Sequence, residues 1–593
     1  MTSSAPEDLT SSEIAMIRSA AEGETLDLGQ GPRANQPETF KEERVIRAVV
    51  LRQLLIDQRW PARSVRLRGA QIRGHLDLTS SVLRCPLYLK ECLFDDGEPV
   101  TLDYATASML TLTGCRLGGG VSGEGVTVTE SLDLSQSELG GPLVLRRAQV
   151  SGWLNCGGAH LKAHALYGDA LNAERMSVGD DVLFDEGFLA EGALRLNEAR
   201  IAGRLVCSGA RLAGTDDGGR SLSAANLTVQ SDVFFGAGFM ADGSLYLNEA
   251  RIAGYLVCSG ARLARDHNGR SLSAAHLAVG NDVFFDAGFT AAGSLRLNDA
   301  EIAGQLVCSG ARLEQADPTG YSLFAERINV GGNVFLDDRF SATGAVSFSF
   351  ARIGRSLRII PENFAEGDNR TAFDGSSMNV ASTLLWAPSK HVLGAVSLEG
   401  AVASELEDHW TAERADGYWP TGGLLRLNGF VYGRIVGTDQ ATVSQRLAWI
   451  RSQYPWSPSA GPHPKTPRQP IAAQPYSQLE WVYRAAGQDR QATTVAIAMR
   501  QDIRHYGDIA FIGRFGNWLM DYTVRYGYQP WRALVSLVAV YVSVVALALI
   551  AQNYNAAIVP IPQNAAGIHG TLSAGHCVNN YPCLTPLDMR STL

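Results

Sequence analysis

The chain has 593 residues, of which 46% are hydrophobic and 19% charged, and it contains 61 glycines. This composition is typical of a folded protein with many turns and excludes a disordered chain. The formal net charge is only −9, and acidic and basic residues are interleaved, so no basic surface suited to a phosphate backbone is expected. We therefore expect no nucleic-acid partner.

The N-terminal segment predicts a helical cap. It begins MTSSAPEDLTSSE, which has neither the basic nor the apolar stretch of a secretory signal, so we expect the bulk of the chain in the cytosol. Thr10–Glu13 and Thr39–Glu42 each match a capping box, and apolar residues at 46, 49, 50 and 54 then share one helical face. A helical cap over residues 1–60 follows.

A long internal repeat dominates the middle of the chain. Three segments nearly coincide: LRLNEARIAGRLVCSGARL (194–212), LYLNEARIAGYLVCSGARL (245–263) and LRLNDAEIAGQLVCSGARL (295–313). Alternating apolar and polar residues in short runs between Gly, Asn and Asp predict strands, and a fixed period predicts a solenoid. We predict a mainly β protein with a right-handed β-solenoid over residues 61–440, in two-coil repeats of about 50 residues best seen over 143–345.

The cysteines are predicted to fill this core. Seven lie in the repeats: Cys85, Cys92, Cys115, Cys156, Cys207, Cys258 and Cys308. Equivalent cysteines two coils apart would be roughly 10 Å from one another, which is too far for a disulfide. No CxxC motif or zinc-spaced Cys/His cluster occurs, so we expect no metal, no cofactor and no catalytic residue.

Stacking of equivalent residues suggests three candidate binding stripes. They are an amide ladder of Asn197, Asn248 and Asn298, an acidic stripe of Glu198, Glu249 and Asp299, and a basic stripe of Arg211, Arg262 and Arg312. The simpler interpretation is that Asn caps turns and charged residues keep the outer face solvated. The alternative is a strip that binds a protein partner, whose identity the sequence does not give.

The C-terminal part is predicted to lead into a membrane. Seven prolines at 455–475 indicate a linker, drawn over residues 441–475, and a helical hairpin with an interfacial helix follows over 476–530. Residues 531–551 carry one charge at their start and are long enough to cross ~30 Å of hydrocarbon as a single transmembrane helix. A short tail, 552–593, completes the chain.

Charge asymmetry around this helix predicts its orientation. Five arginines precede it (Arg500, Arg504, Arg514, Arg525 and Arg532), whereas Arg590 is the only Lys or Arg after it. The positive-inside rule then places the solenoid on the cytoplasmic side of the lipid bilayer. The tail would lie outside, where Cys577 and Cys583 could form a disulfide.

Several motifs together resemble a known family. LTSSEIAMIRSAAEG, VRLRGAQIRGHLDL, the LVCSGARL repeats and YGYQPWRAL are similar to a family of bacterial β-solenoid membrane proteins of pentapeptide-repeat-like character. Relatives are often labelled membrane-associated oxidoreductases, so the resemblance implies the bacterial inner (plasma) membrane and raises an enzymatic role. Relatives also continue past a motif like NYPCLTPLDMRSTL, so the resemblance suggests a shortened chain.

The residues themselves indicate little chemistry. GGGVSG at 118–123 matches a dinucleotide motif, but a strand pattern rather than a helix follows it, and Asp232 and Asp282 recur with the repeat as turn residues do. The favoured function is a membrane-anchored scaffold or protein-interaction module. The alternatives are a membrane-associated enzyme, either an oxidoreductase or a glycan-acting β-helix, and a DNA-mimicking pentapeptide-type inhibitor, which the interleaved arginines disfavour.

Overall fold

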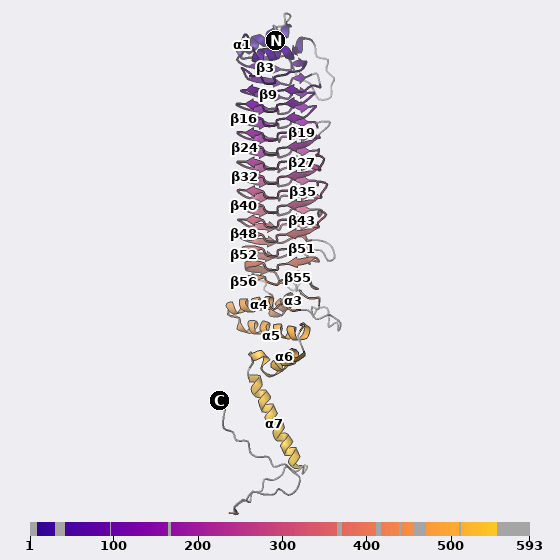
Figure 1. The fold of residues 1–593 in the computed structure, drawn as a ribbon, viewed down its shortest axis with the longest axis vertical. Helices are drawn as coiled ribbons and strands as arrows, with labels where there is room; N and C mark the ends of the chain where they lie inside the picture. Colours follow the sequence, from indigo (N-terminus) through magenta and orange to yellow (C-terminus); the bar gives the residue numbers. More distant parts are fainter. Residues whose placement is uncertain are drawn as a thin grey trace, which may run out of the picture. The chain divides into compact units, whose positions relative to one another are not determined.

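The structure is a computed structural model that describes residues 9–29, 42–94, 97–163, 168–364, 371–410, 417–437, 441–455, 470–508, 511–529 and 531–553. It confirms a mainly β chain with a β-solenoid of about 15 turns and helices near both ends of the described chain (Figure 1). The chain divides into two compact units, Met1–Ala510 and Phe511–Leu593. Each is described by itself.

The central windings of the solenoid each contain four short strands. One winding has β23 (Ala193–Arg195), β24 (Arg200–Ile201), β25 (Leu205–Val206) and β26 (Arg211–Leu212). The next has β27 (Arg220–Ser223), β28 (Thr228–Val229), β29 (Val233–Phe234) and β30 (Met240–Ala241). Equivalent strands pair in parallel, which produces one sheet of 28 strands, containing β24 and β25, and two sheets of 14 strands, containing β26 and β23.

Windings of two lengths alternate, which explains the long sequence repeat. Leu194 pairs with Leu222, and Leu222 pairs with Leu245 in β31 (Ser244–Tyr246), so a step of 28 residues is followed by one of 23. The extra residues form a loop between β26 and β27. A Cβ added at Gly219 in this loop would approach within 3.0 Å of the Asp266 Cα, so the loops of successive repeats also stack closely.

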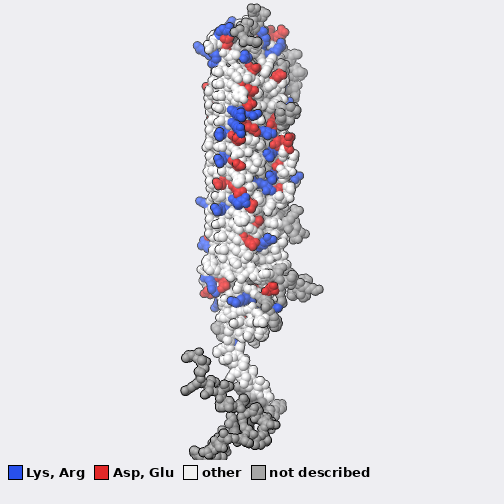
Figure 2. Space-filling model, in the orientation of Figure 1, with Lys and Arg blue, Asp and Glu red and all other residues white. Residues whose placement is uncertain are grey.

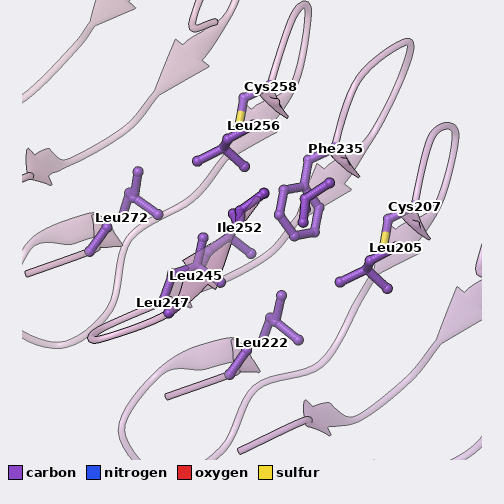
Figure 3. Close-up of a cluster of buried hydrophobic side chains, with 14 of the residues drawn as sticks. Leu205, Cys207, Leu222, Phe235, Leu245, Leu247, Ile252, Leu256, Cys258 and Leu272 are labelled. Carbon is purple, nitrogen blue, oxygen red and sulfur yellow. The ribbon is translucent and has the colours of Figure 1, made fainter. Parts of the chain in front are cut away.

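The interior alternates bulky and small side chains in the same period. Cys207, Phe235 and Cys258 occupy one inward position in three successive windings, with Phe235 between the two thiols (Figure 3). Phe235 also packs against Phe239 in its own winding, with ring centroids 5.0 Å apart. Protein interiors are close-packed. The smaller cysteines in the windings on either side therefore leave the volume that the Phe235 and Phe239 rings fill.

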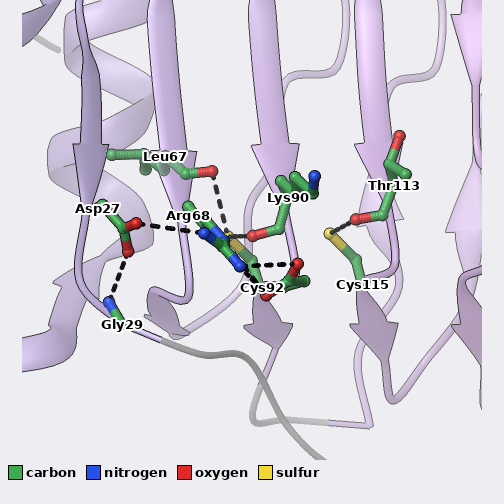
Figure 4. Close-up of polar contacts among 9 residues, drawn as sticks. Asp27, Gly29, Leu67, Arg68, Lys90, Cys92, Thr113 and Cys115 are labelled. Atoms are coloured by element: carbon green, nitrogen blue, oxygen red, sulfur yellow. Dashed lines mark hydrogen bonds and ion pairs between the residues drawn. The ribbon is translucent and has the colours of Figure 1, made fainter.

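The seven solenoid cysteines are free and buried, as predicted. Burial raises the pKa of the thiols in Cys156, Cys207, Cys258 and Cys308 well above the usual value, so these side chains stay protonated at neutral pH. Near the N-terminal end, the Cys92 thiol donates to the Leu67 and Lys90 carbonyls and Cys115 to Thr113 (Figure 4). The thiols therefore act as core residues.

The N-terminal cap combines helices with strands. Helix α1 (Ser11–Glu22) begins with the predicted Thr10 capping box, but α2 (Ala48–Ile56) begins only after Arg47. The second predicted box lies largely outside the described residues, and its last residue, Glu42, opens a short 3₁₀ turn, η1 (Glu42–Arg44). The chain then enters β2 (Val45–Arg47), whose two buried apolar residues pair with the first winding. Strand β1 (Thr25–Asp27) pairs with the first winding in another sheet, and its one apolar residue, Leu26, is half-buried.

The N-terminal cap is joined to the solenoid by ion pairs. Arg68 bridges Asp27 in β1 and Glu91 in the following winding, at 3.3 and 3.2 Å (Figure 4). Within the cap itself, the buried Glu13 of α1 pairs with Arg47 of β2 at 2.6 Å. The first sheet edge is therefore covered by packed structure, which prevents it from pairing with another chain.

Three helices cover the other end of the solenoid. They are α3 (Val443–Arg451), α4 (Gln474–Ala485) and α5 (Asp489–Tyr506), and α4 and α5 form the expected hairpin. The side-chain amides of Gln474 and Gln478 donate to the carbonyls of Phe430 and Tyr432, next to and within the last strand, β56 (Val431–Val436). The hairpin thus packs on the solenoid and replaces the neighbour that β56 lacks.

The prediction of a linker over residues 441–475 is wrong in its first part, where the structure has a helix. Residues 443–451 form α3 because the Thr442 capping box starts a helix whose Leu447, Trp449 and Ile450 are buried. Its Arg446 is 1% exposed and donates to Asp408 at 2.7 Å, while Trp419 donates to the same carboxylate at 3.1 Å. Most of the proline-rich stretch, residues 456–469, lies outside the described residues.

The described residues of the second unit form two helices and a short turn. They are α6 (Phe511–Thr523), η3 (Arg525–Gly527) and α7 (Trp531–Asn553). Residues Trp531–Ile550 of α7 have a mean hydropathy of 2.7, and none of this stretch is buried, so α7 is long and apolar enough to cross a membrane. On α6, Trp518 stacks between Phe515 and Tyr522, with ring centroids 5.9 Å apart in each pair.

Candidate functional site

One corner of the solenoid contains six of the nine predicted stripe residues. At this corner the backbone turns through a left-handed residue in each winding, and Glu198, Glu249 and Asp299 hold that position with φ of 58, 59 and 56°. Their N–H groups donate to carbonyls of the following winding, which fixes the corner. The three asparagines lie one residue earlier, so both stripes belong to one edge of the molecule.

The asparagines do not form an amide ladder. Ala225 lies between Asn197 and Asn248 in the stack, because the sequence repeat spans two windings. The Asn197 Oδ1 instead accepts from the Ser223 hydroxyl and the Ala225 N–H, both at 2.9 Å. Asn248 accepts from the equivalent groups of the next repeat. Asn197 and Asn248 therefore hydrogen-bond to the winding that follows each of them. This agrees with the simpler prediction that the asparagines cap turns.

The acidic stripe is interrupted and partly neutralised. Glu198 pairs with Arg175 at 2.9 Å, and Asp299 pairs with Arg327 at 2.7 Å. The hydrogen bond from each arginine lowers the pKa of its partner carboxyl below the usual value, so both acids are ionised at neutral pH. Two of the three stripe acids are therefore paired with arginines, and the edge is not a continuous acidic surface.

The basic stripe lies on a different sheet. Arg211, Arg262 and Arg312 project from the sheet that contains β26, and Met240 and Thr290 separate them in the stack. All three arginines are exposed. The structure does not bring them together with the asparagine and acidic residues.

The repeated aspartates hold the backbone. Asp232 Oδ1 accepts from the Tyr255 N–H at 2.8 Å, and Asp282 Oδ1 accepts from the Gln305 N–H at 2.7 Å. Each acid thus bonds the winding that follows it, which agrees with a structural role. The GGGVSG segment leads into the short strand β11 (Val121–Ser122), so it does not present a helix N-terminus to a pyrophosphate.

A polar pocket occupies the asparagine edge near its N-terminal part. It measures about 460 Å³. Its walls carry four arginines, Arg146, Arg147, Arg175 and Arg220, and two carboxylates, Glu174 and Glu198. We call it the arginine pocket; its remaining lining residues are Asn197, Ser223, Ala225 and Tyr246.

The arginines of this pocket are held in different ways. Arg175 is paired with Glu198, and Arg146 lies 3.8 Å from Glu124 outside the pocket. The Arg220 guanidinium lies over the Tyr246 ring, 4.3 Å from its centroid, which orients the planar group without neutralising it.

A break in the repeat marks this pocket in the sequence. Later copies read LNEA or LNDA, with Asn and an acid at the corner, whereas the copy at 143–161 reads LRRA, with Arg146 and Arg147 in their places. That substitution was visible from the alignment of repeats. The approach of Arg220 and Tyr246 was not, because it depends on the register of windings far apart in the chain.

A second hollow, of about 530 Å³, lies across the sheet that contains β28 and has a mostly apolar lining. Glu301 is the single carboxylate among its lining residues. A glycan-cleaving site ordinarily has two facing carboxyl groups. Within the described residues, no group of three or more His, Cys, Asp or Glu side chains is arranged to hold a metal ion.

Along the visible face, blue and red residues alternate without a large field of one sign (Figure 2). The predicted tail pair, Cys577 and Cys583, lies outside the described residues.

Comparison of the chain with protein-family models, with curated proteins and with solved structures finds no match.

Proposed function

We propose that this protein is a membrane-anchored scaffold whose solenoid binds a protein partner at the cytoplasmic face of a bacterial plasma membrane. The exposed apolar surface of α7 carries the proposal. Large side chains cover this helix, and more than half of the Leu534, Leu537, Val540 and Tyr541 surfaces is exposed. Apolar surface this extensive is unfavourable in water and suits a lipid environment.

The neighbouring helix supports the same placement. Ile512, Phe515, Trp518 and Tyr522 of α6 are all at least half exposed, and aromatic rings of this kind favour the membrane–water interface. The five arginines that precede or open α7 favour retention of the N-terminal side in the cytosol. This is the basis for placing the solenoid on that side.

The solenoid supports a binding role rather than a catalytic one. Its recurring polar groups are largely engaged in hydrogen bonds or ion pairs between windings, which gives a stiff surface of fixed pattern. Rigid stacked repeats of this type commonly present extended surfaces to other proteins. We place the partner along the edge that contains Asn197, Asn248 and Asn298.

Two measurements test this function. Membranes from cells that produce the full chain are extracted with alkaline carbonate, which leaves spanning proteins behind, and the intact protein is expected in the pellet. A variant with Leu537 and Val540 both changed to Arg should move to the soluble fraction, because each charge at a helix centre costs about 2.5–3.5 kcal/mol of insertion free energy. Release of the unaltered chain by carbonate would refute the anchor.

The partner is sought by cross-linking in native membranes followed by purification of the full chain. The matched control carries Glu249→Lys and Asn298→Ala at the proposed edge and keeps α7. A protein that cross-links to the unaltered chain and is lost from the control supports the scaffold. Identical cross-linked products from both chains would exclude this edge as the binding surface.

A further inference from the structure

The arginine pocket has an excess of positive charge. Four guanidinium groups line the pocket with two carboxylates, Glu174 and Glu198, and a third carboxylate, Glu124, lies 3.8 Å from Arg146 outside it, which leaves an excess of one positive charge. Neither Arg147 nor Arg220 forms an ion pair within the described part of the chain. Elsewhere along this edge, acids and arginines pair with each other, as Arg327 and Asp299 do.

The positions of Arg147 and Arg220 suit a shared ligand. Arg147 lies at the left-handed corner, with φ of 55°, and Arg220 reaches the same pocket from the start of β27, three windings further along the stack. Ala225, whose side chain is a single methyl group, stands where Asn197 and Asn248 stand in the neighbouring windings. The small residue leaves the space that the two arginines border.

We propose that the arginine pocket binds a phosphate group, either free or as a monoester. Guanidinium groups only donate hydrogen bonds, and their planar forks match the oxygens of phosphate and carboxylate. A phosphate carries a charge of about −1.5 to −2 at neutral pH and offers three acceptor oxygens, which can serve the two guanidinium groups of Arg147 and Arg220 at once, whereas a carboxylate offers only two. This inference goes beyond the proposed scaffold function and does not depend on membrane attachment.

The test is isothermal titration of the full-length chain in mild detergent at constant ionic strength. Inorganic phosphate and phenyl phosphate are the probes, and chloride is the reference ion. Phosphate is expected to bind at one site per chain. Tighter binding of phenyl phosphate identifies a monoester as the better ligand, and tighter binding of inorganic phosphate identifies the free ion.

Variants separate the pocket from the rest of the surface. Arg147→Gln and Arg220→Gln should each weaken phosphate binding roughly tenfold, which corresponds to one charge-assisted hydrogen bond of about 1.5 kcal/mol. Ala225→Asn should also weaken phosphate binding, because the larger side chain fills the pocket although it removes no charge. The fold should tolerate this change, because asparagine holds the equivalent position in the two neighbouring windings. Arg262→Gln, at an exposed arginine outside the pocket, is the matched control and should bind as the unaltered chain does.

The pH dependence provides a second readout. Phenyl phosphate affinity should rise between pH 5.5 and 7.5 as this monoester loses its second proton near a pKa of about 6, whereas sulfate affinity should stay constant. Phosphate heats equal to those of chloride would overturn the proposal. Equal loss of affinity in the Arg262→Gln control would overturn it as well, because the effect would then be one of general surface charge.

Discussion

At the scale of single residues, the solenoid depends on two alternations that share one period. Phe235 and Phe239 fill one winding, and Cys207 and Ala210 hold the equivalent positions in the winding before it. The polar edge alternates in the same way, with Asn197 followed by Ala225. Sequence alone identified the repeating residues and the two coils of each repeat, but the predicted amide ladder was wrong, because Ala225 of the intervening winding separates Asn197 from Asn248.

The core alternation predicts that both a loss and a gain of side-chain volume destabilise the fold. Phe235→Ala should lower the free energy of unfolding by about 3–5 kcal/mol, because it leaves a cavity beside Phe239. Cys207→Phe should lower it by about 1–3 kcal/mol by overpacking the same column, whereas Cys207→Ala should have a smaller effect. Chemical denaturation of the three variants checks the order, and a stabilising Cys207→Phe would contradict the packing scheme.

Acid stability should depend on Asp317. Its side chain is 1% exposed; burial would raise the pKa of its carboxyl, but hydrogen bonds from Thr319 and the pairing with Arg296 outweigh burial and lower that pKa. The group therefore stabilises the fold above its unfolded pKa of about 3.9, and this contribution is lost as pH falls through the lower folded value. Asp317→Asn should lower the unfolding free energy by about 2–3 kcal/mol at pH 6.

This difference should shrink steadily below about pH 4, because the unfolded carboxyl then takes up a proton while the native one is still ionised, and it is lost once the pH passes the lower folded pKa. Thermal unfolding of both proteins at several pH values measures it. A difference that is the same at pH 3 and pH 6 would show that the Asp317 charge does not contribute. Ser244→Ala, at another buried polar position, in β31, controls for pH effects unrelated to this carboxyl.

At the scale of elements, the ends of the solenoid were harder to predict than its middle. The strand pattern and the hairpin, α4 and α5, follow from short-range periodicity and were predicted correctly. Helix α3 was missed because the proline-rich sequence that follows it dominated the interpretation of 441–475. The strands β1 and β2 were missed because three-residue strands in a helical context carry almost no pattern of their own.

The buried pair between Arg446 and Asp408 should determine whether the C-terminal helices stay docked. Arg446→Met removes the cation and leaves the Asp408 carboxylate buried with Trp419 as its remaining side-chain donor among the described residues, which should cost about 3–5 kcal/mol of local stability. Hydrogen exchange should then accelerate in α3 and β56 while the central windings keep their protection. Asp408→Asn combined with Arg446→Met should recover part of the loss, and unchanged exchange in the single variant would contradict this role.

At the scale of the whole molecule, regular packing accounts for most of what the sequence revealed. A fixed period over many windings specifies a solenoid with little ambiguity, since each winding buries its apolar face only against its neighbours. The arginine pocket is different because it joins Arg146 and Arg147 to Arg220 and Tyr246, and only the three-dimensional register brings these residues together. A local departure from the repeat was its only sequence signal.

The measurement that tests the central claim most directly is thiol labelling in sealed membranes with an impermeant maleimide. The full chain carries Val82→Cys, a position that is 66% exposed on the solenoid, and its seven native solenoid thiols are buried and should not react. In vesicles that keep the external face outward, we predict labelling of Cys577 and Cys583 after reduction and labelling of the new cysteine at position 82 only after permeabilisation. Labelling of position 82 in intact vesicles, or recovery of the chain outside the membrane fraction, would contradict a solenoid anchored at the cytoplasmic face.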